Sequence, residues 1–89
     1  MMNDFVLRAK DIKEFLEVGL DRPLEHFDMN ADFYKDYGLD SMGAVALFVE
    51  TERRTKVRVT EKDAPTLITG NKLLAFITEA RQIAVSQEE

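Results

Sequence analysis

Hydrophobic residues recur at intervals of three or four over several stretches of the chain, a spacing that gathers side chains on one face of a helix. Near the amino terminus this pattern predicts a helix over residues 3–18, with Asn3 or Asp4 as its N-cap. Gly19 and Pro23 follow, and both residue types are common where a helix ends. The chain is therefore expected to begin with one amphipathic helix.

Near the carboxyl terminus the same spacing predicts a helix over residues 71–84, with Thr69 or Asn71 as its N-cap. Just before it, Asp63-Ala64-Pro65 predicts the start of a short helix, because proline in a first turn sacrifices no hydrogen bond. Gly70 is expected to end this short helix. We therefore expect two helices, one short and one long, in the last third of the chain.

The central helix is predicted over residues 41–54, and its apolar side chains form two stripes. At about 100° per residue, one stripe holds Ala44, Leu47, Phe48 and Thr51, and the other holds Met42, Val45, Ala46 and Val49. We expect the first stripe to face the core. The second indicates either wider burial or a partner surface, and its closeness to the start of the helix favours a partner surface.

Two segments lack helical spacing. Residues 19–39 form a connection of unusual length, which is expected to pack as a unit. The residues that can anchor it are Leu24, Phe27, Met29 and Phe33. Residues 57–60 alternate like a short strand, but no second strand is evident to pair with them. We therefore expect an extended connector that buries Val57 and Val59.

Ser41 stands at the predicted start of the central helix. Gly38 permits a sharp backbone bend, and Asp40 is a strong N-cap, able to accept a hydrogen bond from an early helical N–H. The Ser41 hydroxyl then lies beside amides that have no partner within the helix, at the positive end of the helix dipole. A phosphate on this oxygen would be well placed, and Gly43 adds no side chain that would crowd it.

The stretch Phe33-Tyr34-Lys35-Asp36-Tyr37-Gly38-Leu39-Asp40-Ser41-Met42 resembles the attachment-site signature of acyl carrier proteins. In that family a phenylalanine, an acidic residue, a glycine and an Asp-Ser-Leu/Met triplet recur at this spacing. The resemblance implies that Ser41 carries phosphopantetheine, whose thiol holds acyl cargo as a thioester, with Asp40 as the helix cap beside it. It covers about residues 5–80 and is specific around Ser41.

The resemblance also implies an architecture and a set of partners. The expected fold is an all-α, four-helix carrier-protein bundle with a long first loop and a short third helix. Residues 1–89 are expected to form one domain, with a core over about 5–84 and a frayed tail over 85–89. The implied partners are a phosphopantetheinyl transferase and the enzymes that load, transfer or condense the acyl group, so the chain itself is expected not to be an enzyme.

Composition narrows these expectations. The formal net charge of −5 argues against a nucleic-acid partner, because a phosphate-binding surface needs a basic field. The acids are concentrated before Ser41: residues 1–40 hold ten acids and five bases, whereas residues 41–60 hold two acids and four bases. The chain has no cysteine and no apolar run of membrane-spanning length. We therefore expect a cytoplasmic monomer with no membrane span and no metal site.

Two other kinds of site agree with the sequence less well than the carrier interpretation does. Asp28-Met29-Asn30-Ala31-Asp32 imitates the opening of a calcium-binding EF-hand loop, but Phe33 and Leu39 replace the glycine and the glutamate that such a loop requires. We therefore predict an acidic loop with Asx turns. Ser41 as a catalytic nucleophile would need a base, and the only histidine, His26, lies in the long loop, so catalysis is not expected.

The central helix departs from the pattern of bacterial fatty-acid carriers, which usually present several acids there to basic patches on their partner enzymes. Here Gly43 and Ala46 replace two of the acids, Glu52 keeps the pattern and Arg53 reverses it. Charge governs encounter rate and partner choice. We therefore expect a specialised, free-standing carrier of a lipid, polyketide or amino-acid-loading pathway. The basic run that begins at Arg53 and ends at Arg58 is interpreted as favourable charge at the end of a helix.

The partner surface is expected to consist of the second apolar stripe and the two charged residues beyond it: Met42, Val45, Val49, Glu52 and Arg53. Two alternatives to the specialised carrier stay open. One is the housekeeping carrier of fatty-acid synthesis. The other, of a different class, is a helical protein-interaction module in which Ser41 is never modified and the apolar stripe is a plain docking patch.

Overall fold

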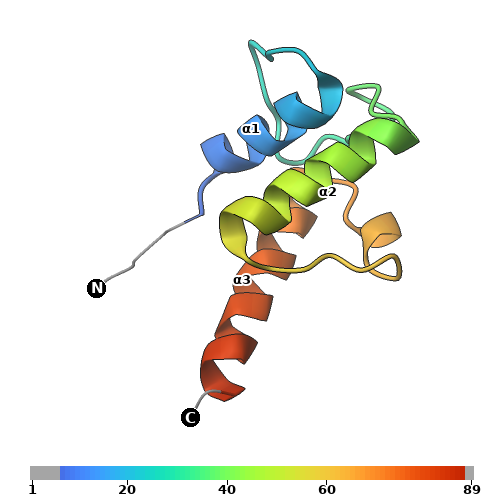
Figure 1. The fold of residues 1–89 in the computed structure, drawn as a ribbon. Coiled ribbons are helices and arrows are strands. Elements are labelled where there is room, and N and C mark those ends of the chain that lie inside the picture. Colours follow the sequence, from blue (N-terminus) through green and yellow to red (C-terminus); the bar gives the residue numbers. More distant parts are fainter. Residues whose placement is uncertain (1–6, 88–89) are drawn as a thin grey trace.

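The computed structural model describes residues 7–87, with side chains described for residues 7–81, and is helical without a strand over that range (Figure 1). Its elements are α1 (Ala9–Leu20), α2 (Ser41–Thr55), the 3₁₀ helix η1 (Ala64–Thr66) and α3 (Gly70–Gln87). The all-α prediction is confirmed. The four-helix prediction is not, because the described residues form three α-helices and the expected short third helix is only the three-residue η1.

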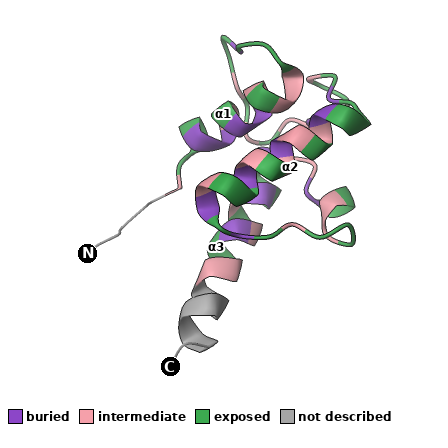
Figure 2. Ribbon diagram, viewed as in Figure 1, coloured by how far each residue is buried: buried purple, intermediate pink, exposed green. Residues whose placement is uncertain are grey.

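The hydrophobic core lies where α1, α2 and α3 meet. α1 packs along α2 and makes a smaller contact with α3 (Figure 1). Each helix turns its buried residues toward this centre (Figure 2). The core residues are Ile12, Phe15, Leu16, Leu24, Phe33, Leu39, Leu47, Val57, Leu67, Leu73 and Ile77.

The first helix begins later than predicted. It starts after Arg8, whose backbone N–H donates a hydrogen bond of 2.9 Å to Oδ2 of Asp11. A carboxylate at the third helical position that binds the N-cap amide is one half of a capping box, and it fixes the start locally. The predicted caps Asn3 and Asp4 lie outside the described residues.

Gly19 lies within α1 instead of ending it, because α1 and α2 approach each other at two glycines. A Cβ on Gly19 would lie only 2.7 Å from the Gly43 carbonyl oxygen, and a Cβ on Gly43 would overlap the Gly19 carbonyl oxygen. Helix packing, rather than room beside Ser41, therefore requires the glycine at position 43. The helix ends at Leu20, and Asp21 follows in the left-handed conformation with a φ of 58°.

The loop between α1 and α2 packs as a unit, as predicted. Leu24 and Phe33 are buried, and Phe27 and Met29 are half-buried against the core. The Phe33 N–H donates a hydrogen bond of 2.7 Å to the Ile68 carbonyl oxygen. This bond fixes the loop to the segment that leads into α3.

The acidic part of this loop forms the predicted Asx turns. Oδ1 of Asp28 accepts a hydrogen bond of 2.8 Å from the Asn30 N–H, and Oδ1 of Asp32 accepts one of 2.7 Å from the Tyr34 N–H. Asp32 also accepts from the backbone N–H of Lys35, and this bond contributes most to lowering the pKa of the Asp32 carboxyl. These carboxylates are therefore engaged by the backbone of their own loop.

Gly70 begins α3 instead of ending a preceding helix. A Cβ on Gly70 would lie 2.6 Å from the sulfur of Met29 and 3.1 Å from the ring of Phe27, so the loop packs where a side chain would be. Thr69 precedes the helix, and its Oγ1 accepts a hydrogen bond of 3.2 Å from the Lys72 N–H. Of the two predicted caps, Thr69 and Asn71, Thr69 therefore acts as the cap of α3.

Two further predictions concern the extended connector and the end of the chain. Val57 is buried and Val59 is half-buried in the extended connector, as expected. Residues 85–87, part of the stretch 85–89 for which a frayed tail is expected, continue α3, and residues 88–89 lie outside the described range. No helix among the described residues has the length and apolar character needed to cross a membrane.

Candidate functional site

Ser41 is the first residue of α2 and has an exposed side chain. The preceding Asp40 is the N-cap: its backbone is extended, and its Oδ1 accepts a hydrogen bond of 2.7 Å from the Gly43 N–H. Gly38 has a φ of 77°, a conformation that glycine adopts without strain. The helix start predicted around Ser41 is therefore confirmed.

The electrostatic surroundings of Ser41 favour an anion. The hydroxyl stands at the amino-terminal end of a helix of 15 residues, where the helix dipole is positive. The first turn of α2 contains no acidic residue, and its early amides have no carbonyl partners within the helix. A phosphate bound to Oγ of Ser41 would therefore be stabilised there.

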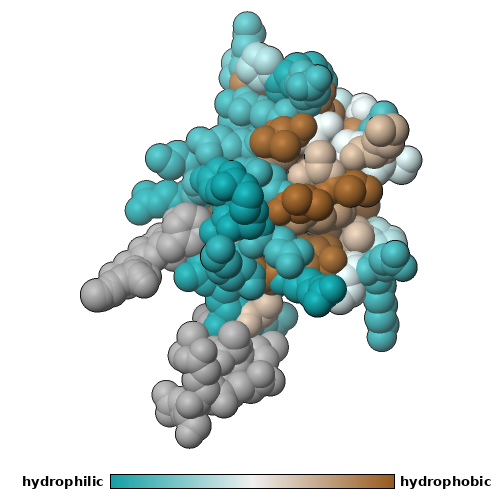
Figure 3. Space-filling model, viewed as in Figure 1, coloured by the Kyte–Doolittle hydropathy of each residue, from teal (hydrophilic) through white to brown (hydrophobic). Residues whose placement is uncertain are grey.

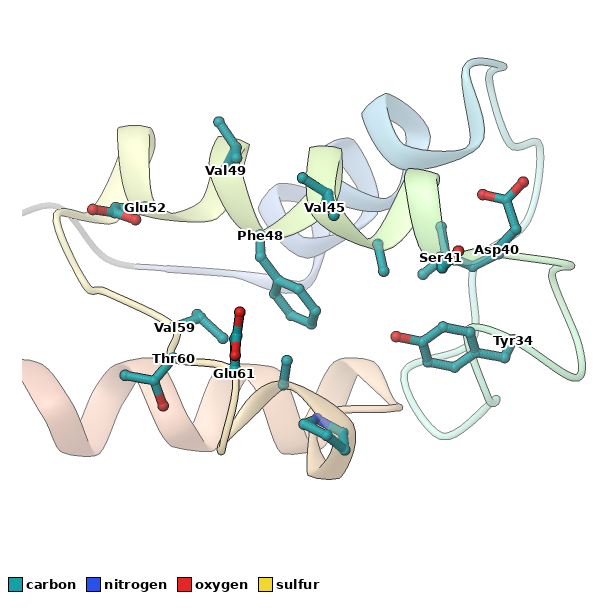
Figure 4. A pocket seen from close by; sticks show the side chains of 14 residues that line it. Tyr34, Asp40, Ser41, Val45, Phe48, Val49, Glu52, Val59, Thr60 and Glu61 are labelled. Atoms are coloured by element: carbon teal, nitrogen blue, oxygen red, sulfur yellow. The ribbon is translucent and has the colours of Figure 1, made fainter.

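A hollow of about 640 Å³ begins beside Ser41 and runs along one side of α2 (Figure 4). α2 contributes Ala44 and Phe48 to its wall, and Val59 and Pro65 line it from the segment that precedes α3. The ring of Phe48 points into this space (Figure 4). Phe48 was predicted to face the core, and it does contact the core, but it is only half-buried because its ring lines the hollow.

Tyr34 enters the hollow from the loop, at the end where Ser41 lies (Figure 4). Burial raises the pKa of its phenol, and the nearby Asp32 carboxylate raises it further. The hydroxyl therefore remains a neutral O–H donor at physiological pH. The residues of α2 and the connector were identified from the sequence as separate elements, but the hollow between them and the part played by Tyr34 were missed.

The second stripe of α2 is exposed. Met42, Val45 and Val49 are 82%, 64% and 60% exposed, whereas Leu47 and Thr51 are fully buried. Figure 3 shows hydrophobic side chains gathered over α2 and bordered by hydrophilic ones. We call Met42, Val45 and Val49 the apolar stripe. The predicted division of α2 into a buried and an exposed face is therefore confirmed for these residues.

The sequence from residue 10 to residue 77 matches the family described as "Phosphopantetheine attachment site". This range covers most of the chain and includes α2 and the hollow. The chain belongs to the phosphopantetheine attachment family. Its members carry the phosphopantetheine arm covalently on a serine, and they serve as carriers for transferases and acyl-handling enzymes instead of acting as catalysts. The matched range of this carrier domain contains a single serine, Ser41.

Glu52 and Arg53, the charged residues expected at the edge of the partner surface, are exposed on the carrier domain. Arg53 pairs with Glu50, with its Nη2 2.7 Å from Oε2 and its Nε 3.2 Å from Oε1. The hydrogen bond to Arg53 lowers the pKa of Glu50, and the same bond raises the pKa of Arg53. The charge of Arg53 is therefore partly offset by a neighbour on the same helix.

The neighbouring Arg54 has a structural role in the carrier domain. Its Nη2 lies 3.3 Å from Oε1 of Glu14 and 3.6 Å from Oδ1 of Asp11, and its Cζ lies 5.3 Å from the centre of the Phe15 ring. These contacts connect the end of α2 to α1. The basic run at the end of α2 thus contains an arginine that is committed to packing.

Proposed function

We propose that Ser41 carries the phosphopantetheine arm and that the thiol of this arm holds acyl intermediates as thioesters. The observation that carries the proposal is the position of the serine. Ser41 is exposed, begins α2 directly after the capping Asp40, and is the one serine in the matched range. An arm on this oxygen would leave the core undisturbed and place its phosphate at the positive end of the helix.

The hollow supports an acyl cargo. It opens next to Ser41, and its wall is formed largely by apolar side chains such as Ala44, Phe48 and Val59. An aliphatic chain that leaves water for such a wall is stabilised by about 25 cal/mol per Å² of buried surface. A chain held there would also be separated from water until a partner enzyme withdraws it.

The test is an intact-mass measurement after incubation with coenzyme A and a broad-specificity phosphopantetheinyl transferase. The wild-type chain should gain the mass of one phosphopantetheine group. If it gains none under conditions that load a known carrier, the proposal fails. The exposed apolar stripe would then support the second candidate, a helical interaction module that is never modified.

We also propose that partner enzymes dock on the apolar stripe, with Glu52 and Arg53 at its edge, and that they belong to a specialised lipid, polyketide or amino-acid-loading pathway. The stripe supports docking because it begins at Met42, next to Ser41, so any enzyme that reaches Ser41 approaches it. The specialised pathway is supported by the half-buried Ala46 and the exposed Arg53, where fatty-acid carriers usually have acids. The housekeeping role remains the alternative.

Acids at positions 46 and 53 should improve the carrier as a substrate for the condensing enzymes of ordinary fatty-acid synthesis. In the loaded Ala46→Glu/Arg53→Glu variant we expect association to be about tenfold faster at low salt, with a gain that shrinks as ionic strength rises. Position 43 is left unchanged because a side chain there would overlap Gly19.

The matched control is Ala46→Gln/Arg53→Gln, which changes size similarly without adding negative charge. Kinetics of transfer over a range of salt concentrations distinguish the two variants. A wild-type rate equal to that of a housekeeping carrier would contradict the specialised pathway. Equal gains in both variants would mean that charge is not what limits docking.

A further inference from the structure

The side chains that line the hollow beside Ser41 include one phenol hydroxyl, that of Tyr34. Tyr34 projects into it from the loop, and its ring is half-buried (Figure 4). Within the described part of the chain, the Tyr34 hydroxyl has no hydrogen-bond partner. No buried side-chain polar atom of the described residues lacks a partner, so this hydroxyl is still accessible to solvent. It is therefore a free O–H donor beside a largely apolar wall, where a cargo could accept its hydrogen bond.

Tyr34 is also the donor that remains available in the hollow. Ser41 would lose its O–H when the arm is attached. Oγ1 of Thr60 donates a hydrogen bond of 2.8 Å to Oδ2 of Asp63, so it is engaged. Glu52 and Glu61 are exposed, and an ionised carboxylate only accepts. Among the described residues that line the hollow, Tyr34 therefore presents an uncommitted O–H donor.

We propose that the Tyr34 hydroxyl donates a hydrogen bond to an oxygen on the cargo, close to its thioester, and so makes the hollow selective for 3-hydroxyacyl or 3-oxoacyl chains over unsubstituted ones. The proposal rests on the proposed function, because it requires an arm on Ser41 that delivers its cargo into the hollow. It deepens that function by assigning a substrate class.

The position of Tyr34 along the hollow determines which cargo oxygen it reaches. Tyr34 lies at the end nearest Ser41, whereas Val59 lies beside the part farther along α2 (Figure 4). An aliphatic tail is stabilised against the side chains of Phe48 and Val59. The thioester end of the chain then lies toward Tyr34. An oxygen on the third carbon lies three bonds from the thioester carbonyl carbon and is therefore carried to the same end.

The experiment compares two cargoes of equal length on the intact protein. Hexanoyl and 3-hydroxyhexanoyl groups are installed on Ser41 from the corresponding coenzyme A thioesters by the transferase. Release of each thioester by hydroxylamine is then measured and divided by the rate for the free coenzyme A thioester. One hydrogen bond corresponds to protection of 3-hydroxyhexanoyl that is about three- to tenfold greater than that of hexanoyl.

Tyr34→Phe should reduce this difference to less than about twofold while hexanoyl stays protected as in the wild type, because the ring and its apolar contacts remain. Tyr37→Phe is the matched control. The Tyr37 hydroxyl accepts a hydrogen bond of 2.8 Å from the Asp28 N–H, and Tyr37 does not line the hollow. Its loss should leave the preference for 3-hydroxyhexanoyl unchanged.

A direct readout is available because the chain has only two tyrosines. With tyrosine labelled by ¹³C at Cζ, the Tyr34 signal should move further when the protein carries 3-hydroxyhexanoyl than when it carries hexanoyl. The Tyr37 signal should respond equally to both. Assignment follows from the signal that disappears in Tyr34→Phe.

The outcomes separate this proposal from the proposed function. If Ser41 cannot be loaded, the carrier function itself fails. If loading succeeds but neither chain is protected, or both are protected equally, the selectivity proposal is overturned and the carrier function stands. A preference for 3-hydroxyhexanoyl that survives in Tyr34→Phe also overturns it, because another group must then be the donor.

Discussion

Alanine at position 41 should abolish arm attachment and leave the fold intact. The Ser41 side chain is exposed and makes no hydrogen bond within the described part of the chain, so its removal breaks no contact there. Asp40 still caps α2, and alanine has the highest helix propensity. Intact mass after incubation with coenzyme A and transferase should show no addition to Ser41→Ala. The free energy of unfolding should stay within about 0.5 kcal/mol of the wild type.

The chain offers a matched control for this variant, because its second serine, Ser86, lies outside the range that matches the family. Ser86→Ala should accept one phosphopantetheine group at the wild-type rate. An addition to Ser41→Ala, or a loss of addition in Ser86→Ala, would contradict the assignment of the arm to Ser41. The pair of variants therefore tests the residue separately from the family.

The features around Ser41 were predictable because their signals are local. Asp40 accepts a hydrogen bond from an amide three residues away, and Gly38 supplies the positive φ at the turn. The hydrophobic anchors of the long loop could also be recognised, because they are apolar residues that lie outside the periodic pattern of the helices. Packing of the loop against the core explains why they are apolar. A short stretch of sequence contains the whole of each of these signals.

Two glycines were misassigned because their roles depend on contacts between distant segments. Gly19 has the position of a helix stop, yet it continues α1 because the carbonyl oxygen of Gly43 lies where its side chain would be. Gly70 has the same appearance, yet it begins α3 because Phe27 and Met29 pack against it. Sequence shows that a glycine is present, but whether it permits a bend or a close approach depends on what packs there.

The hollow was not predictable for a related reason. It is lined by Phe48 of α2 and by Val59 and Pro65, and no pattern in the sequence indicates that the connector returns along this side of the helix. Helical spacing placed Phe48 on the stripe that faces the core, and Phe48 does contact the core. Helical spacing does not indicate the distance between α2 and the segment that contains Val59 and Pro65. The hollow lies between these two elements and has room for a ligand.

Leu47→Ala and Val49→Ala should separate stability from function on the two faces of α2. Leu47 is fully buried, so its truncation leaves a cavity and should lower the free energy of unfolding by about 3–5 kcal/mol, a large share of the stability of a small domain. Val49 is 60% exposed, so Val49→Ala should stay within about 0.5 kcal/mol of the wild type. Denaturant melts of the two variants measure these losses.

The rate of arm attachment should show the opposite order. If the apolar stripe is where the transferase docks, Val49→Ala should slow attachment, because apolar anchors at the centre of an interface contribute much of its binding energy. Leu47→Ala, measured at a temperature where it remains folded, should be modified at nearly the wild-type rate. Attachment slowed only by Leu47→Ala would mean that the transferase responds to stability and that the stripe is not its docking surface.

Phe48→Ala should lower stability by an amount between the losses in Val49→Ala and Leu47→Ala. Phe48 is half-buried, contacts the core and lines the hollow, so its truncation removes fewer packing contacts than that of Leu47. We therefore expect a loss of about 1–3 kcal/mol, smaller than for Leu47→Ala, together with faster release of a loaded acyl chain by hydroxylamine. A loss as large as that of Leu47→Ala with unchanged release would place Phe48 in the core alone. Slower attachment without faster release would place it on the docking surface instead.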